Sequence, residues 1–175
     1  RLAHVQAALY RGDAPAAWRR LEASEPGLRR SLLTRVQAFR VESLYLRGRC
    51  AIAMAGAESA SRRRYLSLAR ACARRIARER MDWSDPLGLL LAAGIASAEG
   101  RAEFAAAYLA DAVERSDRAE MGMYAAVARQ RLGALLAGDS GRELLRSSEV
   151  WMADQQIRNP GCLTRMLAPG FSQAS

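Results

Sequence analysis

Apolar residues recur along the whole chain with the spacing of α-helices, and segment 58–81 shows the pattern most plainly. Its apolar positions are Tyr65, Leu68, Cys72 and Ile76. Its basic positions are Arg63, Arg70, Arg74 and Arg78. Both sets repeat at intervals of three, four or seven residues, so each occupies one face of a helix. We expect the apolar face to pack against the rest of the protein and the basic face to meet water.

Residues that cap helices mark several predicted helix starts. The cap-and-proline pairs are Asp13 with Pro15, Ser84 with Pro86, and Asn159 with Pro160. In each pair the proline falls in the first helical turn, where its missing N–H is not needed. Ser140 and Glu143 have the spacing of a capping box. The pattern predicts helices over residues 2–11, 14–23, 30–55, 58–81, 86–98, 101–116, 119–137, 141–157 and 160–167.

The same order of elements, an apolar helix, a short turn and an amphipathic helix, occurs four times. The turns lie at Gly12, Gly56, Gly100 and Gly138, which are 44, 44 and 38 residues apart. This period is longer than the roughly 34 residues of a tetratricopeptide unit and lies near that of other helix-pair repeats. We therefore predict an all-α fold in which antiparallel helix pairs stack as a degenerate tetratricopeptide-like α-solenoid.

No segment rich in proline, glycine or serine divides the chain, so residues 1–175 are expected to form a single helical-repeat domain with a loose tail over 171–175. A short last helix begins at Pro160, and Phe171 is expected to fold back onto the open end of the stack as a cap. The sequence starts at Arg1 and enters a helical pattern at once, which predicts a fragment of a longer protein.

Composition supports a folded helical protein and argues against several other classes. Half of the 175 residues are apolar, and alanine and leucine dominate over β-branched and aromatic residues. Cys50, Cys72 and Cys162 form neither an even set nor a CxxC pair, so neither a disulfide framework nor a zinc site is expected. The most apolar stretch, 87–98, is shorter than the roughly 20 residues of a membrane span. With no signal peptide in view, we expect a cytoplasmic location.

The sequence offers little that could carry catalysis, and we expect no catalytic residue, no metal site and no cofactor. His4 is the single histidine, and general-base or metal chemistry needs convergent partners that it lacks. Residues 138–141 fit a turn better than a phosphate loop, which needs a lysine that this chain does not have. One group of acidic residues fits a solvated face rather than a metal site. It consists of Asp111, Glu114, Asp117 and Glu120.

Aromatic residues are expected to lie in the core. Trp18, Trp83 and Trp151 each stand beside a turn or within an apolar face, which is typical of anchors between helix layers. In the helix predicted over 101–116, one set of residues is expected to continue the packing face. This set consists of Phe104, Tyr108, Leu109 and Ala112.

The positive charge is concentrated on one predicted helix. The formal net charge is +9, and all 27 basic residues are arginine. Exclusive use of arginine is typical of the codon bias of a GC-rich genome, so the charge is weaker evidence that the protein binds nucleic acid. Residues 60–80 contain eight arginines and one glutamate. The candidate binding residues on this helix are Arg63, Arg70, Arg74 and Arg78. Their guanidinium groups fit three interpretations: solvated or internally paired side chains, an acidic protein partner, or nucleic acid. Nucleic acid is the weakest, because no exposed aromatic residues alternate with the arginines.

The last third of the chain carries a family resemblance. The residues that carry it are Arg142-Glu143-Leu144-Leu145-Arg146, Val150-Trp151-Met152-Ala153, Gln156-Ile157-Arg158-Asn159-Pro160 and Met166-Leu167-Ala168-Pro169-Gly170-Phe171. This stretch resembles the C-terminal tail of bacterial, notably myxobacterial, multidomain signalling proteins, although Gln156 stands where that family has glycine. In these proteins a serine/threonine kinase domain, sometimes followed by an AAA-type ATPase module, ends in helical repeats.

The resemblance implies a regulatory context rather than an activity. This chain has no glycine-rich nucleotide loop, no HRD and no DFG motif, so a kinase domain would precede Arg1. We expect a non-catalytic protein-interaction or regulatory module at the C-terminus of a bacterial signalling kinase. Its partner would be another protein or the parent's own catalytic domain, bound at the arginines and at the concave surface formed by the first helix of each pair. Two alternatives stay open: the sensor repeat domain of a STAND-type ATPase regulator, and a basic helical-repeat module that binds nucleic acid.

Overall fold

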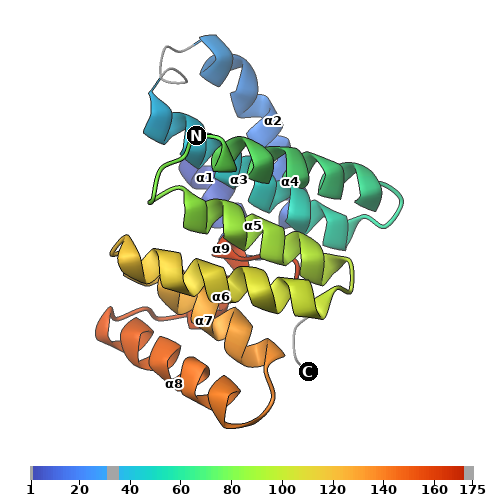
Figure 1. Cartoon of the computed structure of the whole chain (residues 1–175). Helices are drawn as coiled ribbons and strands as arrows, with labels where there is room; N and C mark the ends of the chain where they lie inside the picture. Colours follow the sequence, from blue (N-terminus) through green and yellow to red (C-terminus); the bar gives the residue numbers. More distant parts are fainter. Residues whose placement is uncertain (1, 31–35, 172–175) are drawn as a thin grey trace.

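The computed structural model describes residues 2–30 and 36–171, and every regular element within them is an α-helix (Figure 1). The helices are α1 (Leu2–Tyr10), α2 (Ala14–Arg30), α3 (Gln37–Ala57), α4 (Arg62–Ala77), α5 (Asp85–Ala98), α6 (Ala102–Arg118), α7 (Gly122–Leu135), α8 (Gly138–Asp154) and α9 (Pro160–Leu167). The prediction of an all-helical fold is confirmed. Residues 31–35 of the third predicted helix and 172–175 of the predicted tail lie outside the described residues.

Several helix boundaries differ from the predicted ones by three residues or more, among them the end of α2 and both ends of α4. α2 continues through Pro26, although a proline inside a helix removes one backbone hydrogen bond. α4 begins at Arg62 rather than at residue 58, because Glu58 is held in the preceding turn. The carboxylate of Glu58 accepts hydrogen bonds from the hydroxyl groups of Ser61 (2.9 Å) and Tyr65 (3.2 Å).

Neighbouring helices pack in pairs, and the pairs follow one another in chain order. From α1 to α8, each helix contacts the next helix along the chain. The helices α1, α3, α5 and α7 also contact the next odd-numbered helix, so together they form one side of the molecule, which we call the odd-numbered face. Figure 1 shows α4, α5 and α6 stacked in this order on the near side.

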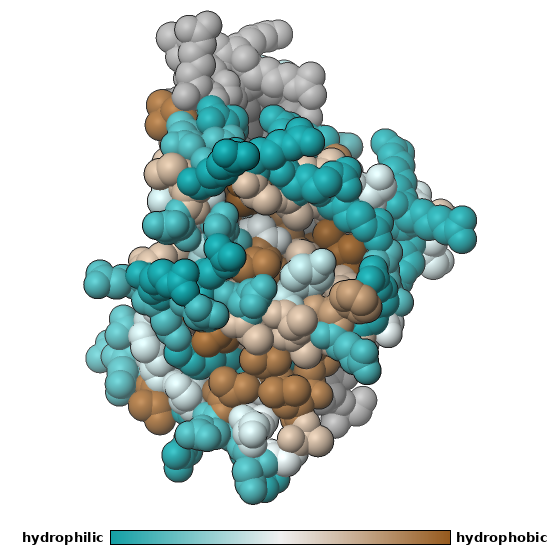
Figure 2. Space-filling view, viewed as in Figure 1, coloured by the Kyte–Doolittle hydropathy of each residue, from teal (hydrophilic) through white to brown (hydrophobic). Residues whose placement is uncertain are grey.

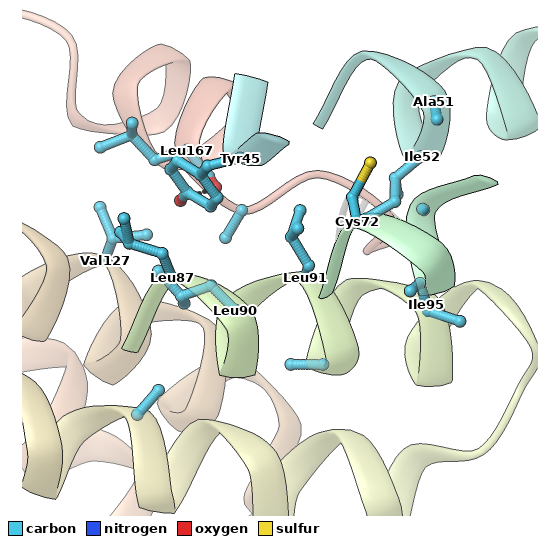
Figure 3. Close-up of a cluster of buried hydrophobic side chains, with 14 of the residues drawn as sticks. Tyr45, Ala51, Ile52, Cys72, Leu87, Leu90, Leu91, Ile95, Val127 and Leu167 are labelled. Atoms are coloured by element: carbon cyan, nitrogen blue, oxygen red, sulfur yellow. Dashed lines mark hydrogen bonds between the residues drawn. The ribbon is translucent and has the colours of Figure 1, made fainter. Parts of the chain in front are cut away.

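Two clusters of buried apolar side chains fill the space between the helices. The larger one contains residues from α2 to α9, and the smaller one joins α1, α2 and α3. Tyr45 and Leu87 lie deep in the larger cluster (Figure 3). Trp18, Trp83 and Trp151 are partly buried and pack against this cluster, as predicted for anchors between helices. Trp18 packs against the smaller cluster as well, so the two clusters act as one core.

The last helix lies against the odd-numbered face rather than at the open end of the stack. α9 contacts both α1 and α7, and Figure 1 shows it behind α5. Leu167 is buried in the larger cluster, and Met166 packs against both clusters. The prediction that Phe171 and the last helix seal the open end of the stack is therefore wrong. The apolar residues of α9 bury more surface between α1 and α7 than they would on an exposed end.

Three consecutive carbonyl groups at the C-terminal end of α9 accept hydrogen bonds from side chains of α3 and α7. The bonds run from Arg49 Nη1 to Met166 O (3.2 Å), from Tyr45 Oη to Leu167 O (2.6 Å) and from Arg131 Nε to Ala168 O (3.0 Å). Figure 3 shows Tyr45 beside Leu167. The last carbonyls of a helix have no partner within the helix and carry a partial negative charge, so hydroxyl and guanidinium donors stabilise them. We call these three donors the α9 cap.

Arg49 is a buried charge held by this arrangement. It is 1 % exposed and, among the described residues, has no carboxylate partner. Its guanidinium carbon lies 4.5 Å from the centroid of the Tyr45 ring, so a ring face and the helix carbonyl take the place of a carboxylate.

Two glycines allow the segment after α9 to meet α5. A Cβ atom on Gly94 would lie 2.3 Å from the carbonyl oxygen of Pro169, which is a backbone atom that cannot rotate away. Gly170 has a φ of +100°, and a Cβ atom there would lie 2.4 Å from the carbonyl oxygen of Gly94. The contact therefore requires glycine on both sides.

The predicted caps differ in outcome. Asp13 and Asn159 each accept a hydrogen bond from the backbone N–H three residues later, at 2.9 Å and 3.0 Å, as predicted. Ser84 does not cap α5, because its backbone is already helical (φ −88°, ψ −27°); its hydroxyl donates to the carbonyl of Met81 (3.0 Å). Ser140 cannot form a capping box, because α8 begins earlier, at Gly138, and Ser140 lies inside it.

A doubly bonded ion pair joins the start of α3 to the segment after α4. Arg40 Nε lies 2.7 Å from Glu79 Oε1, and Arg40 Nη2 lies 2.7 Å from Oε2. The side-chain amide of Gln37 also donates to Oε2 (3.0 Å). The hydrogen bonds from Arg40, and then from Gln37, lower the pKa of Glu79 from 4.5 to about 2.

Gly94→Ala tests the contact between α5 and the segment after α9. We expect this variant to lose about 1–3 kcal/mol of unfolding free energy in urea titrations, because Pro169 must move. The matched control is Gly56→Ala in α3, where a Cβ meets nothing within 4 Å; it should gain up to about 1 kcal/mol from helix propensity. Equal stability of the two variants would contradict the close approach.

Glu79→Gln tests the ion pair through its pH dependence. Because the pKa of Glu79 is lowered by folding, the pair stabilises the protein fully above pH 4.5, and this contribution is lost as the pH falls toward about 2. Wild-type unfolding free energy, measured in urea at a series of pH values, should fall more steeply across this window than that of Glu79→Gln. Glu143→Gln on the exposed surface of α8 is the control and should follow the wild type.

Candidate functional site

The arginines that the sequence singles out follow one face of α4 and its end. Arg63, Arg74 and Arg78 are exposed, and Arg70 is half-buried. Figure 2 views the molecule from the same side as Figure 1 and shows hydrophilic side chains gathered over α4, with hydrophobic surface exposed next to them. The arginines therefore border a surface that is not uniformly polar.

These arginines differ in their partners. Arg70 forms an ion pair with Glu99, which follows α5 directly. In the described part of the chain, Arg63, Arg74 and Arg78 have no carboxylate partner. The adjacent Arg62 has a structural role, because it donates to the last carbonyls of two helices, Ala55 O of α3 (3.3 Å) and Ala98 O of α5.

A hollow of about 210 Å³ lies beside these arginines, between α4 and α6. We call it the basic groove. Its lining includes Arg70 and Arg74 of α4 and Ala92 and Ala96 of α5. It also includes Glu99, which follows α5, Arg101, which precedes α6, and Tyr108 of α6. The alanines leave space on the floor, and the long arginine and tyrosine side chains form the walls.

The aromatic side chains of α6 point outward, which corrects the sequence prediction. Phe104 is 52 % exposed and Tyr108 is 37 % exposed, whereas Leu109 and Ala112 are fully buried. The packing face of α6 consists of Ala105, Leu109, Ala112 and Ser116. Successive members of this set are three or four residues apart, so Phe104 and Tyr108 fall on the side of the helix that faces solvent.

Arg101 and Phe104 form a contact at the rim of the basic groove. The guanidinium carbon of Arg101 lies 4.1 Å from the centroid of the Phe104 ring. At an exposed site such a cation–π contact contributes about 0.5–1 kcal/mol, which favours this arrangement of the two side chains. The rim therefore presents an aromatic surface beside a positive charge.

The basic groove carries excess positive charge. Three guanidinium groups and one carboxylate, that of Glu99, line it. The ion pair of Glu99 with Arg70 is partly exposed, with 26 % and 38 % of the two side chains accessible, so it adds little stability and leaves Glu99 free to exchange partners. Farther along α6 the exposed residues include Asp111 and Glu114, which limit the positive region to the groove and α4.

The concave surface predicted for binding is not free. α9 and the segment after it lie against the odd-numbered face, where Gly94 of α5 meets Pro169. The apolar side chains of α9 cover the apolar surface of α1, α3, α5 and α7, as a bound helix would. This part of the predicted binding surface is therefore occupied by the chain itself.

The described residues offer little reactive chemistry. Burial raises the pKa of the Cys50 thiol to about 12 and also raises that of Cys72, so both stay protonated and unreactive at neutral pH. Within residues 2–30 and 36–171, no group of three or more histidine, cysteine, aspartate or glutamate side chains is placed to hold a metal ion. Two members of the acidic set form ion pairs, Glu114 with Arg118 and Asp117 with Arg129.

None of the described helices combines the length and the apolar character that crossing a membrane requires.

Comparison of the chain with protein-family models, with curated proteins and with solved structures gives no match in any of the three. The residues and geometry of the basic groove therefore carry the functional argument.

Two alanine substitutions on α6 test which side of this helix packs. Leu109→Ala should lose about 2–5 kcal/mol of unfolding free energy, because it leaves a cavity in the core. Phe104→Ala should lose about 1 kcal/mol or less, since it removes an exposed ring and one cation–π contact. Urea titrations of both variants provide the measurement. A loss at Phe104 as large as that at Leu109 would restore the packing face predicted from the sequence.

Proposed function

We propose that this chain is a non-catalytic protein-interaction module and that the basic groove binds an acidic segment of a partner protein. One observation carries the proposal: helices α4, α5 and α6 bring three guanidinium groups and an exposed tyrosine to one hollow. Arginine forms charge-assisted hydrogen bonds with carboxylates, and tyrosine and arginine are enriched at the centres of protein interfaces. The partner would place carboxylates on Arg74 and Arg101 and an apolar or aromatic side chain against Tyr108.

Nucleic acid is the second candidate, and one observation favours it. Phe104 and Tyr108 are exposed beside arginines, and exposed aromatic rings can stack on bases. The charge distribution favours the acidic protein segment, because Glu99 lies in the groove and Asp111 and Glu114 follow on α6. A phosphate backbone carries a charge at every nucleotide and would meet these carboxylates, whereas a short acidic segment ends within the groove.

The biological setting that we propose follows from the resemblance at residues 142–171. The chain would be a tetratricopeptide-like stack of helix pairs from the regulatory end of a bacterial serine/threonine kinase, working in the cytoplasm. The acidic segment would then belong either to another signalling protein or to the parent's own catalytic domain. The pairwise packing of α1 to α8 supports such a stack, since each pair buries the apolar faces of its neighbours.

Fluorescence anisotropy with a labelled peptide tests the proposed function. The probe contains glutamate, serine and one phenylalanine, and its control has glutamine in place of glutamate. We expect the acidic probe to bind, and its affinity to fall as the salt concentration rises, because Arg74 and Arg101 are exposed. Arg74→Gln and Tyr108→Ala should each weaken binding about tenfold, which corresponds to about 1.4 kcal/mol.

Glu99→Gln provides a test in the opposite direction. Removing this carboxylate frees Arg70, so the acidic probe should bind more tightly while the unfolding free energy changes by about 1 kcal/mol or less. Arg146→Gln on exposed α8 is the control for the loss of one positive charge and should bind like the wild type. Equal binding of the glutamine peptide, or tighter and more salt-dependent binding of single-stranded DNA, would contradict the proposal.

A further inference from the structure

Two hollows meet at a shared wall beneath the segment that follows α9. The first has a volume of about 500 Å³ and lies between α1, α3, α5 and this segment. The second, of about 580 Å³, lies between α7, α8 and α9. Four residues line both hollows: Ser97, Arg131, Arg165 and Phe171. The shared wall therefore carries two guanidinium groups.

In the described part of the chain, no carboxylate lies on this shared wall. No aspartate or glutamate is among the described residues that line either hollow. Arg131 donates to the carbonyl of Ala168 (3.0 Å) and lies over the ring of Phe171, 4.8 Å from its centroid. Arg49 has the same two kinds of contact, but for Arg131 they do not offset the like charge of Arg165. The pair is thus left with a net positive charge in a partly buried place.

Arg165 is the less satisfied of the two. Its guanidinium donates to the sulfur of Cys162 (3.1 Å), which is a weak acceptor. Its Nε is buried and has no partner among the described residues. A buried donor without a protein acceptor is unfavourable, so an acceptor placed in the hollow would stabilise this N–H group.

The two guanidinium groups also oppose each other. Burial, together with the charge of Arg165, lowers the pKa of Arg131 from 12.5 to about 10. Both effects disfavour the charged form of Arg131 in the folded protein. An anion on the shared wall would neutralise this repulsion.

From this geometry we propose that the first hollow binds a small organic anion, with its carboxylate or phosphate group on Arg131 and Arg165 and its apolar body among α1, α3 and α5. The apolar wall is supplied by Leu9, Ile52 and Ala53, and Arg62 lies at the same hollow. The volume falls in the usual range of small-molecule sites, about 300–1,000 Å³. This site shares no lining residue with the basic groove, so it is independent of the proposed function.

Thermal unfolding with defined anions tests this site. The probes are phenyl phosphate and benzoate, which join an anion to an apolar body, together with inorganic phosphate and benzyl alcohol, which supply only one of these parts. Sodium chloride keeps the ionic strength equal in every sample. We expect phenyl phosphate or benzoate to raise Tm by about 3–6 °C at roughly ten times its Kd. Inorganic phosphate should bind about tenfold more weakly, and benzyl alcohol should leave Tm unchanged.

Arg165→Met separates a binding role from a structural one. The variant keeps an apolar stem and removes one of two like charges, so its Tm without ligand should equal or exceed that of the wild type. Its Tm gain with phenyl phosphate should be lost, with affinity reduced about tenfold or more. Arg158→Met, at an exposed position before α9, is the matched control and should keep the full gain.

A second variant keeps the arginines and fills the hollow. Ala57→Leu adds an apolar side chain to an exposed part of the lining. It should lower the affinity for phenyl phosphate and leave the affinity for inorganic phosphate unchanged. The proposal is overturned if sodium chloride alone reproduces the Tm gain, or if Arg165→Met retains it. It is also overturned if the gain is lost in Arg74→Gln instead, because the anion would then bind in the basic groove.

Discussion

The carbonyl groups at the end of α9, which have no partner within the helix itself, set the constraint on which the rest of the structure depends. Their three donors come from α3 and α7, so these helices must lie on either side of the end of α9. This placement takes Arg49 out of water with no carboxylate beside it among the described residues, and a helix end and a ring face stabilise its charge instead. It also brings the backbone after α9 onto α5, where glycine is needed on both sides.

The position of α9 divides the molecule into two kinds of surface. The odd-numbered face is covered by α9, and what remains open there is a pair of hollows whose shared wall is cationic. The side that carries α4 and α6 keeps its arginines and aromatic rings in solvent. An extended macromolecular segment fits the second surface, whereas a small ligand fits the first. The two proposals thus concern separate places and separate sizes of partner.

The sequence was sufficient for the helices and insufficient for their long-range arrangement. The alternation of apolar and polar residues in α4 placed Cys72 and Ile76 in the core and Arg74 in solvent. In α6 Leu109 and Ala112 were predicted correctly as packing residues, but Phe104 was chosen over Ala105 because it is larger, although the helical period favoured the alanine. Nothing local distinguished Arg131 and Arg165, since their shared wall is created by α7, α9 and the segment that follows. The position of a residue in the helical period therefore predicted its burial better than the size of its apolar side chain.

The hydrogen bond from Tyr45 to Leu167 spans 122 residues of sequence, and this span has a kinetic consequence. In a linear array of repeats each unit needs only its neighbours, so folding can proceed step by step from any point. Here a core tyrosine of α3 finds its acceptor only after α9 has been synthesised and has returned to the first helices. The search for that contact carries a loop-closure entropy that local helix pairing does not. On the ribosome, α1 to α8 would therefore wait with an open apolar face until α9 arrives.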